Sequence, residues 1–502
     1  MIPLTLSEVA EATGGRLHNS DGSELVTGSV EFDSRQVGPG GLFVALPGDR
    51  VDGHDFAATA VERGAVGVLA ARPVNAPAVV VPPVTDAHVR SVALTGDSDG
   101  SGAAVLAGLA RLARDVVDRL APRGLTVVGV TGSSGKTSTK DLIAQVLEPT
   151  GATVAPPGSF NNELGHPWTV LRADADTRHL VLELSARGPG HIRALCETAP
   201  PRIGVVLNVG TAHLGEFGSQ EDIAATKGEL AESLPAAERG GVAILNADDP
   251  LVRAMAERTT ARVVLVGESE DAQVRAADVE LDDHARATFT LVTPRGTRTV
   301  TLGLHGGHHV GNALAAAAVG LELGAGLDAI AERLRGARRL SARRMEVSTR
   351  ADDVTVVNDA YNANPESVGA ALRTLARMAG SEEGRGRRRT WAVLGVMGEL
   401  GDSGAEAHEQ IGRLAMRLHI DRLVAVDEQA GGIQHGARLE GTTGATPSSR
   451  SGYWEEPVLV PDVEAAVALL NAELRPGDVV LVKASKVAAL WRVADAILGA
   501  RA

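Results

Sequence analysis

An apolar run at residues 125–130, LTVVGV, leads directly into the segment TGSSGKT and then into a helix-forming stretch. The run suits a buried parallel strand. The following helix would present one apolar face, formed by Leu142, Ile143, Val146 and Leu147. This order predicts a phosphate-binding loop, because small residues let backbone N–H groups surround an anion at a helix N-terminus. The chain therefore has to contain a parallel α/β sheet with a nucleotide site at its edge.

The predicted loop consists of Thr131, Gly132, Ser133, Ser134, Gly135, Lys136 and Thr137. Lys136 would reach the β- and γ-phosphates of ATP or GTP, and the Thr137 hydroxyl would bind Mg²⁺. Val130 stands where the strict pattern has glycine, while the TGxxGKT part is intact. Lys140 lies further along the helix, and we expect it to be solvated.

Strand-like runs alternate with helical stretches in two blocks. HLVLEL, RIGVVLNV, GVAILNAD and RVVLVG follow the loop, and VTVVND, TWAVLGV, RLVAVD and DVVLVKAS follow residue 340. Such alternation indicates doubly wound α/β domains. Because 502 residues suggest about three domains, we predict an α/β protein divided into 1–121, 122–339 and 340–502.

Composition argues against several classes of partner. A net charge of -14 and an aromatic share of 2% argue against nucleic acid or a membrane surface as the main partner. The single cysteine, Cys196, rules out an intramolecular disulfide and fits a reducing cytoplasm. The N-terminal residues do not resemble a signal peptide, and no apolar run is long enough to span a membrane. We expect a cytoplasmic monomer that acts on small molecules.

Polar residues follow the predicted central strands. Glu183 ends HLVLEL, Asn208 ends IGVVLNV, and His213 comes shortly after. Ligands of open α/β sheets collect at the carboxyl ends of strands, and a carboxylate with an imidazole beside a triphosphate can bind Mg²⁺. Taken alone, Glu183 and His213 are more often satisfied structural residues than ligands, and it is the upstream phosphate loop that favours the ligand role.

Lys227 is placed on an apolar helix face. Ile223, Lys227, Leu230 and Leu234 share one side of the helix that Ser219 would cap. Burial would lower the pKa of the amine, and a neutral amine reacts with CO₂ to give a carbamate that can bind a metal. From the residues alone, a lysine that extends past the edge of this face into water is the favoured alternative.

Five segments carry a family resemblance. TGSSGKTS, FNNELGHP, LELSARGPGHI, NVGTAHLGEFGS and TKGEL, in this order, resemble the Mur ligases over nearly the whole chain. The resemblance implies a UDP-binding domain, a central ATPase domain and a C-terminal Rossmann-like domain for the amino substrate. It is closest to the members that join D-alanyl-D-alanine to UDP-N-acetylmuramoyl-tripeptide with ATP and two Mg²⁺ ions through an acyl phosphate.

The resemblance also implies roles for single residues. Metal ligands would be Thr137, Glu183, His213 and a carbamoylated Lys227. The UDP substrate would contact Ser34, Arg35, Asn161 and Asn162. Beyond the loop, ATP would contact Asn312 at adenine, Arg344 near the phosphates, and Asp359, Tyr361 and Asn362 at the ribose. The amino substrate would contact Met397, Glu399, Lys483 and Ser485. Nucleotide contacts on both sides of residue 340 suggest that the C-terminal domain closes on binding.

The chain departs from the family pattern in places. Val396 replaces a usual acidic residue, Ala186 and Arg187 stand where asparagine is common, and VKASK replaces VKGSR. These departures concern the contacts with the amino substrate. Three alternatives stay open: another ligase of the same family, including the folylpolyglutamate type, a nucleotide-binding regulator, and a GTPase switch, which lacks an evident NKxD motif here.

Overall fold

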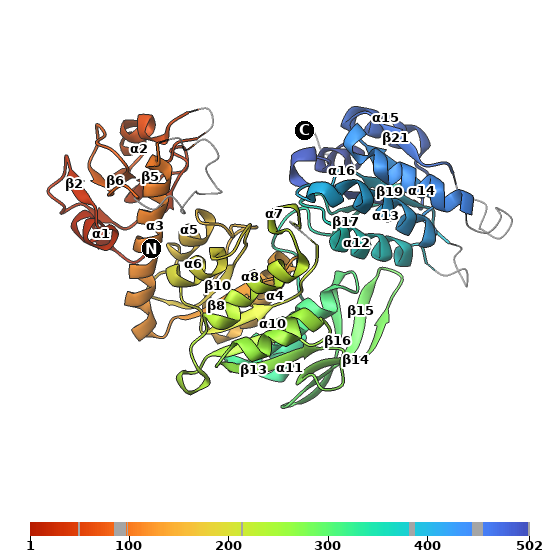
Figure 1. Ribbon diagram of the computed structural model, residues 1–502, viewed down its shortest axis with the longest axis horizontal. Coiled ribbons are helices and arrows are strands. Elements are labelled where there is room, and N and C mark those ends of the chain that lie inside the picture. The colour runs from red at the N-terminus through yellow and green to blue at the C-terminus, as the bar shows by residue number, and fades with distance from the viewer. Residues whose placement is uncertain are drawn as a thin grey trace.

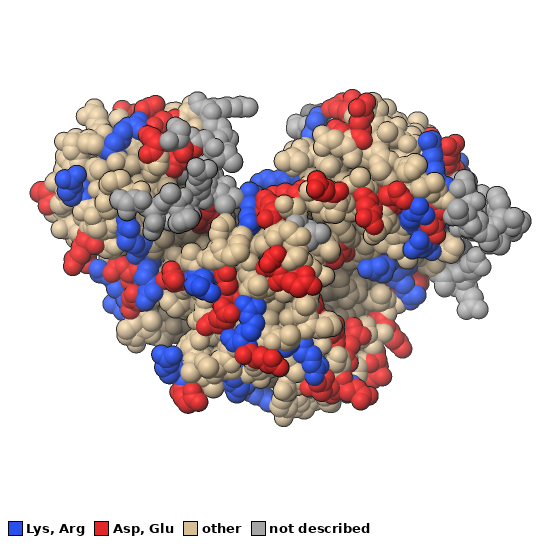
Figure 2. Space-filling view, in the orientation of Figure 1, with Lys and Arg blue, Asp and Glu red and all other residues tan. Residues whose placement is uncertain are grey.

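The structure is a computed structural model that describes residues 1–48, 51–84, 97, 99–211, 214–380, 387–443 and 455–499. Figure 1 shows three lobes, with the N-terminal and C-terminal lobes standing on either side of the central lobe. In the space-filling view of Figure 2 the surface is hollowed between these two outer lobes. None of the helices in the described ranges is long and apolar enough to cross a membrane.

The N-terminal lobe is a small α/β unit. Its described strands form a sheet in the order β2-β7-β6-β5-β4 and a separate pair, β1-β3. The strands are β1 Leu4–Thr5, β2 Arg16–His18, β3 Leu25–Val26, β4 Val30–Glu31, β5 Gly41–Val44, β6 Ala65–Ala70 and β7 Ala78–Val80. The helices are α1 Leu6–Thr13, α2 Ala57–Glu62 and, leading to the central lobe, α3 Ser101–Leu120.

The central lobe contains the largest sheet in the described part of the chain. Its order is β16-β15-β14-β13-β12-β11-β8-β10-β9, parallel from β9 to β14 and antiparallel beyond. The strands are β8 Thr126–Thr131, β9 Ala152–Val154, β10 Thr177–Glu183, β11 Ile203–Val206, β12 Val242–Asn246, β13 Arg262–Gly267, β14 Val274–Leu281, β15 Arg286–Thr293 and β16 Gly296–His305. The helices are α4 Lys136–Leu147, α5 Gly165–Val170, α6 His191–Thr198, α7 Leu214–Phe217, α8 Gln220–Glu232, α9 Pro250–Arg253, α10 His309–Glu322 and α11 Leu327–Arg335.

The C-terminal lobe is a second doubly wound unit. Its sheet has the order β17-β18-β22-β19-β20-β21, with only β17 antiparallel among the described strands. The strands are β17 Glu346–Thr349, β18 Thr355–Asn358, β19 Thr390–Leu394, β20 Arg422–Val426, β21 Val458–Val460 and β22 Val479–Lys483. The helices are α12 Pro365–Met378, α13 Gly404–Arg417, α14 Gly431–Thr443, α15 Val463–Glu473 and α16 Trp491–Leu498. The predicted α/β fold class is confirmed.

The hydrophobic cores are divided unevenly among the lobes. One cluster runs without a break from the N-terminal lobe through α3 to one face of the central sheet, and α4 and α10 cover the other face. The two clusters of the C-terminal lobe consist, apart from Ala285, of residues beyond 340. The N-terminal and central lobes are therefore joined by a common core, whereas the C-terminal lobe packs largely on its own.

Candidate active site

The phosphate loop lies at the carboxyl edge of the central sheet. In the parallel register, Glu183 of β10 lies opposite Val130 of β8, and Val206 of β11 lies opposite Thr131. The ends of these strands therefore meet where the loop begins. The Asn208 side chain, just after β11, accepts a hydrogen bond from the Ser134 backbone N–H at 2.9 Å and holds the loop in place.

Gly135 is required at its position. Its φ of 83° is in the left-handed region, and a Cβ there would lie 2.7 Å from the Asn312 Oδ1. Helix α4 starts at the next residue, so its first N–H groups point into the loop, as an anion site needs. Asn312, predicted to read adenine, is buried on α10 against this glycine and contacts His309 Nδ1 at 3.3 Å.

Two cationic side chains donate hydrogen bonds to oxygens of the phosphate loop. Lys136 Nζ donates to the Gly132 carbonyl at 2.6 Å, and burial lowers the pKa of this lysine, with Glu183 opposing the shift. Arg344 Nη2 donates to the Thr137 hydroxyl at 3.2 Å, and its guanidinium lies 4.1 Å from the centre of the Tyr361 ring. Arg344, which follows the central lobe in sequence, thus reaches the residue predicted to bind Mg²⁺.

Glu183 carries an unused acceptor. It is fully buried, and its Oε2 accepts from Ser159 Oγ at 3.0 Å and Asn161 Nδ2 at 3.2 Å. Its Oε1 is buried and has no hydrogen-bond partner among the described residues. A buried carboxylate oxygen without a partner is costly, so it fits a position next to a cation.

The predicted metal site is described only in part. His213 lies outside the described residues, so its proposed ligand role stays a prediction. No group of three or more His, Cys, Asp or Glu side chains in the described ranges could hold a metal ion. Three predicted ligands lie in the described ranges: Glu183, Thr137 and Lys227. Of these, only Glu183 is a His, Cys, Asp or Glu.

Lys227 is buried as its helix pattern predicts. The side chain lies on α8 with 6% exposure, and Ile223 and Leu230 on the same face are buried with it, as is Leu234, just past the end of the helix. Burial, together with the positive charge of Lys136, lowers the pKa of Lys227 to about 7. The alternative, a lysine that extends into water past the edge of the face, is wrong. Carbamoylation itself stays a prediction.

Asp359 and Lys483 contact each other, although the resemblance assigns them to different substrates. Lys483 Nζ donates to Asp359 Oδ2 at 2.6 Å and to the Asn362 carbonyl at 2.9 Å, and all of these atoms lie in the C-terminal lobe. Asp359 Oδ1 accepts from the Met345 N–H at 3.0 Å. Burial lowers the pKa of Lys483, and Asp359 opposes this shift.

A cleft of about 410 Å³ brings eleven of the predicted site residues together. The predicted residues on its wall are Ser133, Ser134, Gly135, Lys136, Thr137, Asn161, Arg344, Tyr361, Asn362, Glu399 and Ser485. Sequence reasoning missed several wall residues, among them Ser159, Ser185, Asn364, Lys486 and Val487. No local sequence pattern indicated that one of them, Val487, would be 87% exposed.

Other predicted residues lie away from this wall. Met397 is buried, and its backbone N–H donates to His408 Nε2 at 2.9 Å. Asn162 Oδ1 accepts from the Gly165 N–H at 2.9 Å at the start of α5. Ser34 and Arg35 lie in the N-terminal lobe, where the largely exposed Arg35 pairs with Asp33 at 2.8 Å.

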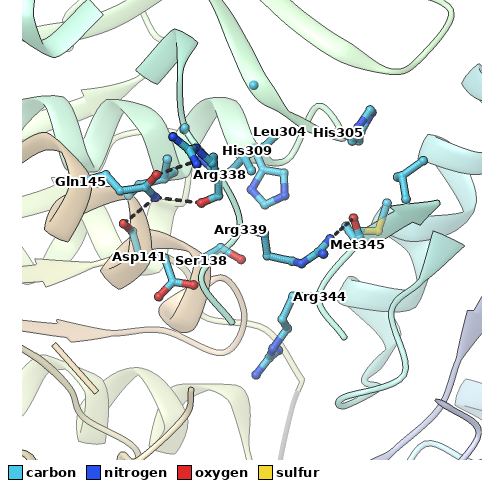
Figure 3. A pocket seen from close by; sticks show the side chains of 14 residues that line it. Ser138, Asp141, Gln145, Leu304, His305, His309, Arg338, Arg339, Arg344 and Met345 are labelled. Atoms are coloured by element: carbon cyan, nitrogen blue, oxygen red, sulfur yellow. Dashed lines mark hydrogen bonds between the residues drawn. The ribbon is translucent and has the colours of Figure 1, made fainter. Parts of the chain in front are cut away.

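A second pocket, of about 310 Å³, adjoins the cleft and is drawn in Figure 3. Its wall combines α4 from Ser138 onward, His305 and His309, and the segment after α11. Gln145 and the Arg338 backbone exchange two hydrogen bonds, at 2.8 and 2.9 Å, which fasten this segment to α4. Arg344 lines both the pocket and the cleft.

Lys140 is not solvated, and the expectation that it would be is wrong. It is 1% exposed, donates to the Pro156 carbonyl at 2.7 Å and forms an ion pair with Asp141. Ser341 Oγ, in the segment between the central and C-terminal lobes, lies 3.5 Å from the ammonium. Segments distant in sequence thus cover a lysine whose local pattern gave no sign of burial.

The C-terminal lobe also contacts the loop that follows β11. Glu366, in the first turn of α12, accepts from the Thr211 N–H at 2.6 Å and from its hydroxyl at 2.8 Å. Its second oxygen is buried without a hydrogen-bond partner in the described residues. Asn364 Nδ2 lies 3.5 Å from the Ser133 carbonyl. The α12 N-terminus therefore bridges the phosphate loop and the segment that leads to His213.

Known proteins resemble this chain over its whole length. Family models match at residues 28–111 (Mur ligase family, catalytic domain), 130–320 (Mur ligase middle domain) and 343–486 (Mur ligase, glutamate ligase domain). The UDP-N-acetylmuramoyl-tripeptide–D-alanyl-D-alanine ligase of Mycobacterium tuberculosis is 55% identical, covering 99% of this chain and 98% of that protein. The enzyme of the same name from Escherichia coli is 32% identical, covering 99% of each.

Solved structures agree with this result. The crystal structure of MurF from Acinetobacter baumannii superposes with a TM-score of 0.80 and 28% identity, covering 99% of each chain. MurF ligase from Thermotoga maritima in complex with ADP superposes with a TM-score of 0.73 and 28% identity, covering 95% of this chain and 98% of that one. Sequence, fold and the phosphate loop at the cleft thus lead to one conclusion: this chain belongs to the Mur ligase family.

Proposed function

We propose that this chain is an ATP-dependent ligase that joins D-alanyl-D-alanine to UDP-N-acetylmuramoyl-tripeptide and releases ADP and phosphate. The product would be the UDP-linked pentapeptide of peptidoglycan synthesis. The observation that carries the proposal is one cleft whose wall combines Lys136 and Thr137 of the phosphate loop with Glu399 and Ser485 of the opposite lobe. Relatives that share this activity in their names, and that align over the whole chain, support the same substrates.

The reaction would proceed in two steps. The tripeptide carboxylate attacks the γ-phosphorus of ATP, ADP leaves, and an acyl phosphate forms. The neutral amine of the dipeptide then attacks the acyl carbon, and phosphate leaves from the tetrahedral intermediate. Both reactants of the first step are anions, so the positive charges of Lys136 and Arg344 beside the loop would offset their repulsion.

The chain offers side chains that could hold Mg²⁺. Thr137 and Glu183 would hold one ion, and His213 with carbamoylated Lys227 would hold the other. Support comes from the unpartnered Glu183 Oε1 and from the depressed pKa of Lys227. When bound, Mg²⁺ would add positive charge beside the transferred phosphoryl group.

We place the adenosine in the second pocket. The pocket begins at Ser138, one residue past the loop, and shares Arg344 with the cleft. His309 lies on its wall and contacts Asn312, the residue predicted to read adenine. The ribose contacts predicted for Asp359, Tyr361 and Asn362 would then come from the C-terminal lobe, which we infer moves against the central lobe when ATP binds.

Each substrate would bind mainly to one of the three lobes. Residues 1–121 would bind the UDP precursor with Ser34 and Arg35, together with Asn161 and Asn162 of the central lobe. Residues 122–339 would bind ATP, and 340–502 would receive the dipeptide through Met397, Glu399, Lys483 and Ser485. The enzyme would act as a monomer in the cytoplasm.

Phosphate release from ATP, measured with UDP-N-acetylmuramoyl-tripeptide in the presence and absence of D-alanyl-D-alanine, tests the proposal. Release that requires both substrates, with a pentapeptide detected by mass, is the expected result. Turnover with another amine or another acceptor would keep the ligase chemistry and refute the substrate pair. Binding of ATP and the UDP precursor without turnover would favour a nucleotide-binding regulator.

A further inference from the structure

Arg187 lies on the cleft wall, and with Ala186 it occupies the place where the family pattern commonly has an asparagine. It follows β10, four residues beyond Glu183, and its side chain is 45% exposed. Its Nη2 is 3.2 Å from Oε1 of Glu399, which belongs to the C-terminal lobe. A second carboxylate, that of Glu216, lies 4.0 Å from the Arg187 Nε. The guanidinium thus reaches across the cleft to the residue predicted to bind the amine.

The described cations on the cleft wall divide into two groups. Lys136 donates to Gly132, and Arg344 donates to Thr137, so both are engaged with the phosphate loop. Arg187 and Lys486 are the other described cations on this wall. Arg187 is paired instead with a carboxylate of the opposite lobe, which places its charge on the side of the cleft where the amine would enter.

A dipeptide at neutral pH carries one ammonium and one carboxylate. The Arg187–Glu399 pair presents the two complementary charges on neighbouring side chains of the same cleft. Both side chains are about half exposed, and an ion pair in that setting stabilises the protein little, so a ligand can replace it at small cost. A planar guanidinium also binds a carboxylate through two parallel hydrogen bonds, which a lysine or an asparagine cannot match.

We propose that Arg187 is a specificity-determining residue that binds the C-terminal carboxylate of the incoming dipeptide, while Glu399 holds its amino end. This inference rests on the proposed function, and it identifies Arg187 as the residue that binds the carboxylate of the dipeptide substrate. It assigns a task to Arg187 that asparagine could not perform in the same way. The exchange of the Arg187–Glu399 pair for the two ends of the ligand would also orient the amine toward the acyl phosphate.

The test compares D-alanyl-D-alanine with its C-terminal amide, which lacks the negative charge. We expect wild-type protein to prefer the acid by about 10- to 100-fold in kcat/KM. Arg187→Gln should remove most of this preference by raising the KM for the acid, and Arg187→Lys should restore part of it. The KM values for ATP and for the UDP-tripeptide should not change, and the amide should react as with wild type.

Lys486→Gln is the matched control, because it removes the other cleft cation not engaged with the loop. It should keep the preference for the acid. The inference is overturned if Arg187→Gln slows acid and amide equally, if it raises the KM for the UDP-tripeptide instead, or if Lys486→Gln abolishes the preference. Wild-type protein that makes no product with either dipeptide would refute the proposed function itself, before any variant is compared.

Discussion

Replacing Lys227 by methionine tests whether this buried amine becomes a carbamate. An ordinary lysine with a pKa of 10.5 is neutral at pH 7 in only about 3 of 10,000 molecules. With its pKa lowered to about 7 by burial, roughly half of the Lys227 side chains are neutral at the same pH. Burial therefore raises the population able to react with CO₂ by roughly a thousand-fold. Reaction releases a proton and leaves a negative group beside Lys136.

Carbon-13 NMR of protein equilibrated with ¹³C-bicarbonate measures the product directly. We expect a carbamate resonance in wild-type protein that is absent in Lys227→Met and retained in Lys486→Met, whose lysine is exposed. The neutral fraction rises from about one-tenth at pH 6 to about nine-tenths at pH 8 for a pKa near 7, so the resonance should grow over this range. Ligase activity should fall in CO₂-free buffer in parallel.

One combination of results would refute this reasoning. Wild-type protein would show no carbamate resonance at pH 8 beyond those of Lys227→Met, and its activity would be the same with and without CO₂. If Lys227→Met also kept its activity, the buried amine would have no part in the reaction. Loss of activity in Lys227→Met without a carbamate would instead assign the neutral amine a different role.

Three further measurements follow from the structure. Gly135→Ala should weaken ATP binding at least tenfold by calorimetry, because its φ of 83° and the nearby Asn312 leave a methyl group no room; unchanged affinity would contradict this. Ile143→Ala should lower the free energy of unfolding in urea by about 2–5 kcal/mol, and Ile143→Val by about 0.5–1.5 kcal/mol, because the side chain is fully buried; equal losses would argue against tight packing there. Lys227 binds its proton less tightly when folded, with a pKa of about 7 instead of 10.5, so stability should rise with pH between these values in wild type and not in Lys227→Met; parallel curves would refute the shift.

The features that sequence predicts well here depend on neighbours along the chain. The phosphate loop needs only a strand, small residues and a helix in order, and the structure has β8, the loop and α4 in that order. Lys227 is similar, because the spacing of Ile223 and Leu230 within one helix already places it on the buried face. The spacing of apolar residues and the order of strand, loop and helix are local properties, so they can be recognised without the tertiary structure.

The features that sequence could not provide depend on distant contacts. Lys140 is buried because Pro156 and Ser341 approach it, and the second lies 201 residues away. The same holds for Arg187 and Glu399, which belong to different lobes. No helical or strand period encodes such pairs. A lysine or arginine in a polar stretch therefore looks solvated until the fold brings its partners to it.

The shared core of the N-terminal and central lobes has a consequence for thermal unfolding. Since one cluster of apolar side chains spans both lobes through α3, they should lose structure in a single cooperative transition. The C-terminal lobe, with clusters that are almost entirely its own, should melt separately, so scanning calorimetry should resolve two heat-absorption peaks. A nucleotide held by both the phosphate loop and Asp359 would couple the two units and draw the peaks together. The same division would make the C-terminal lobe the part that moves as a rigid body during turnover.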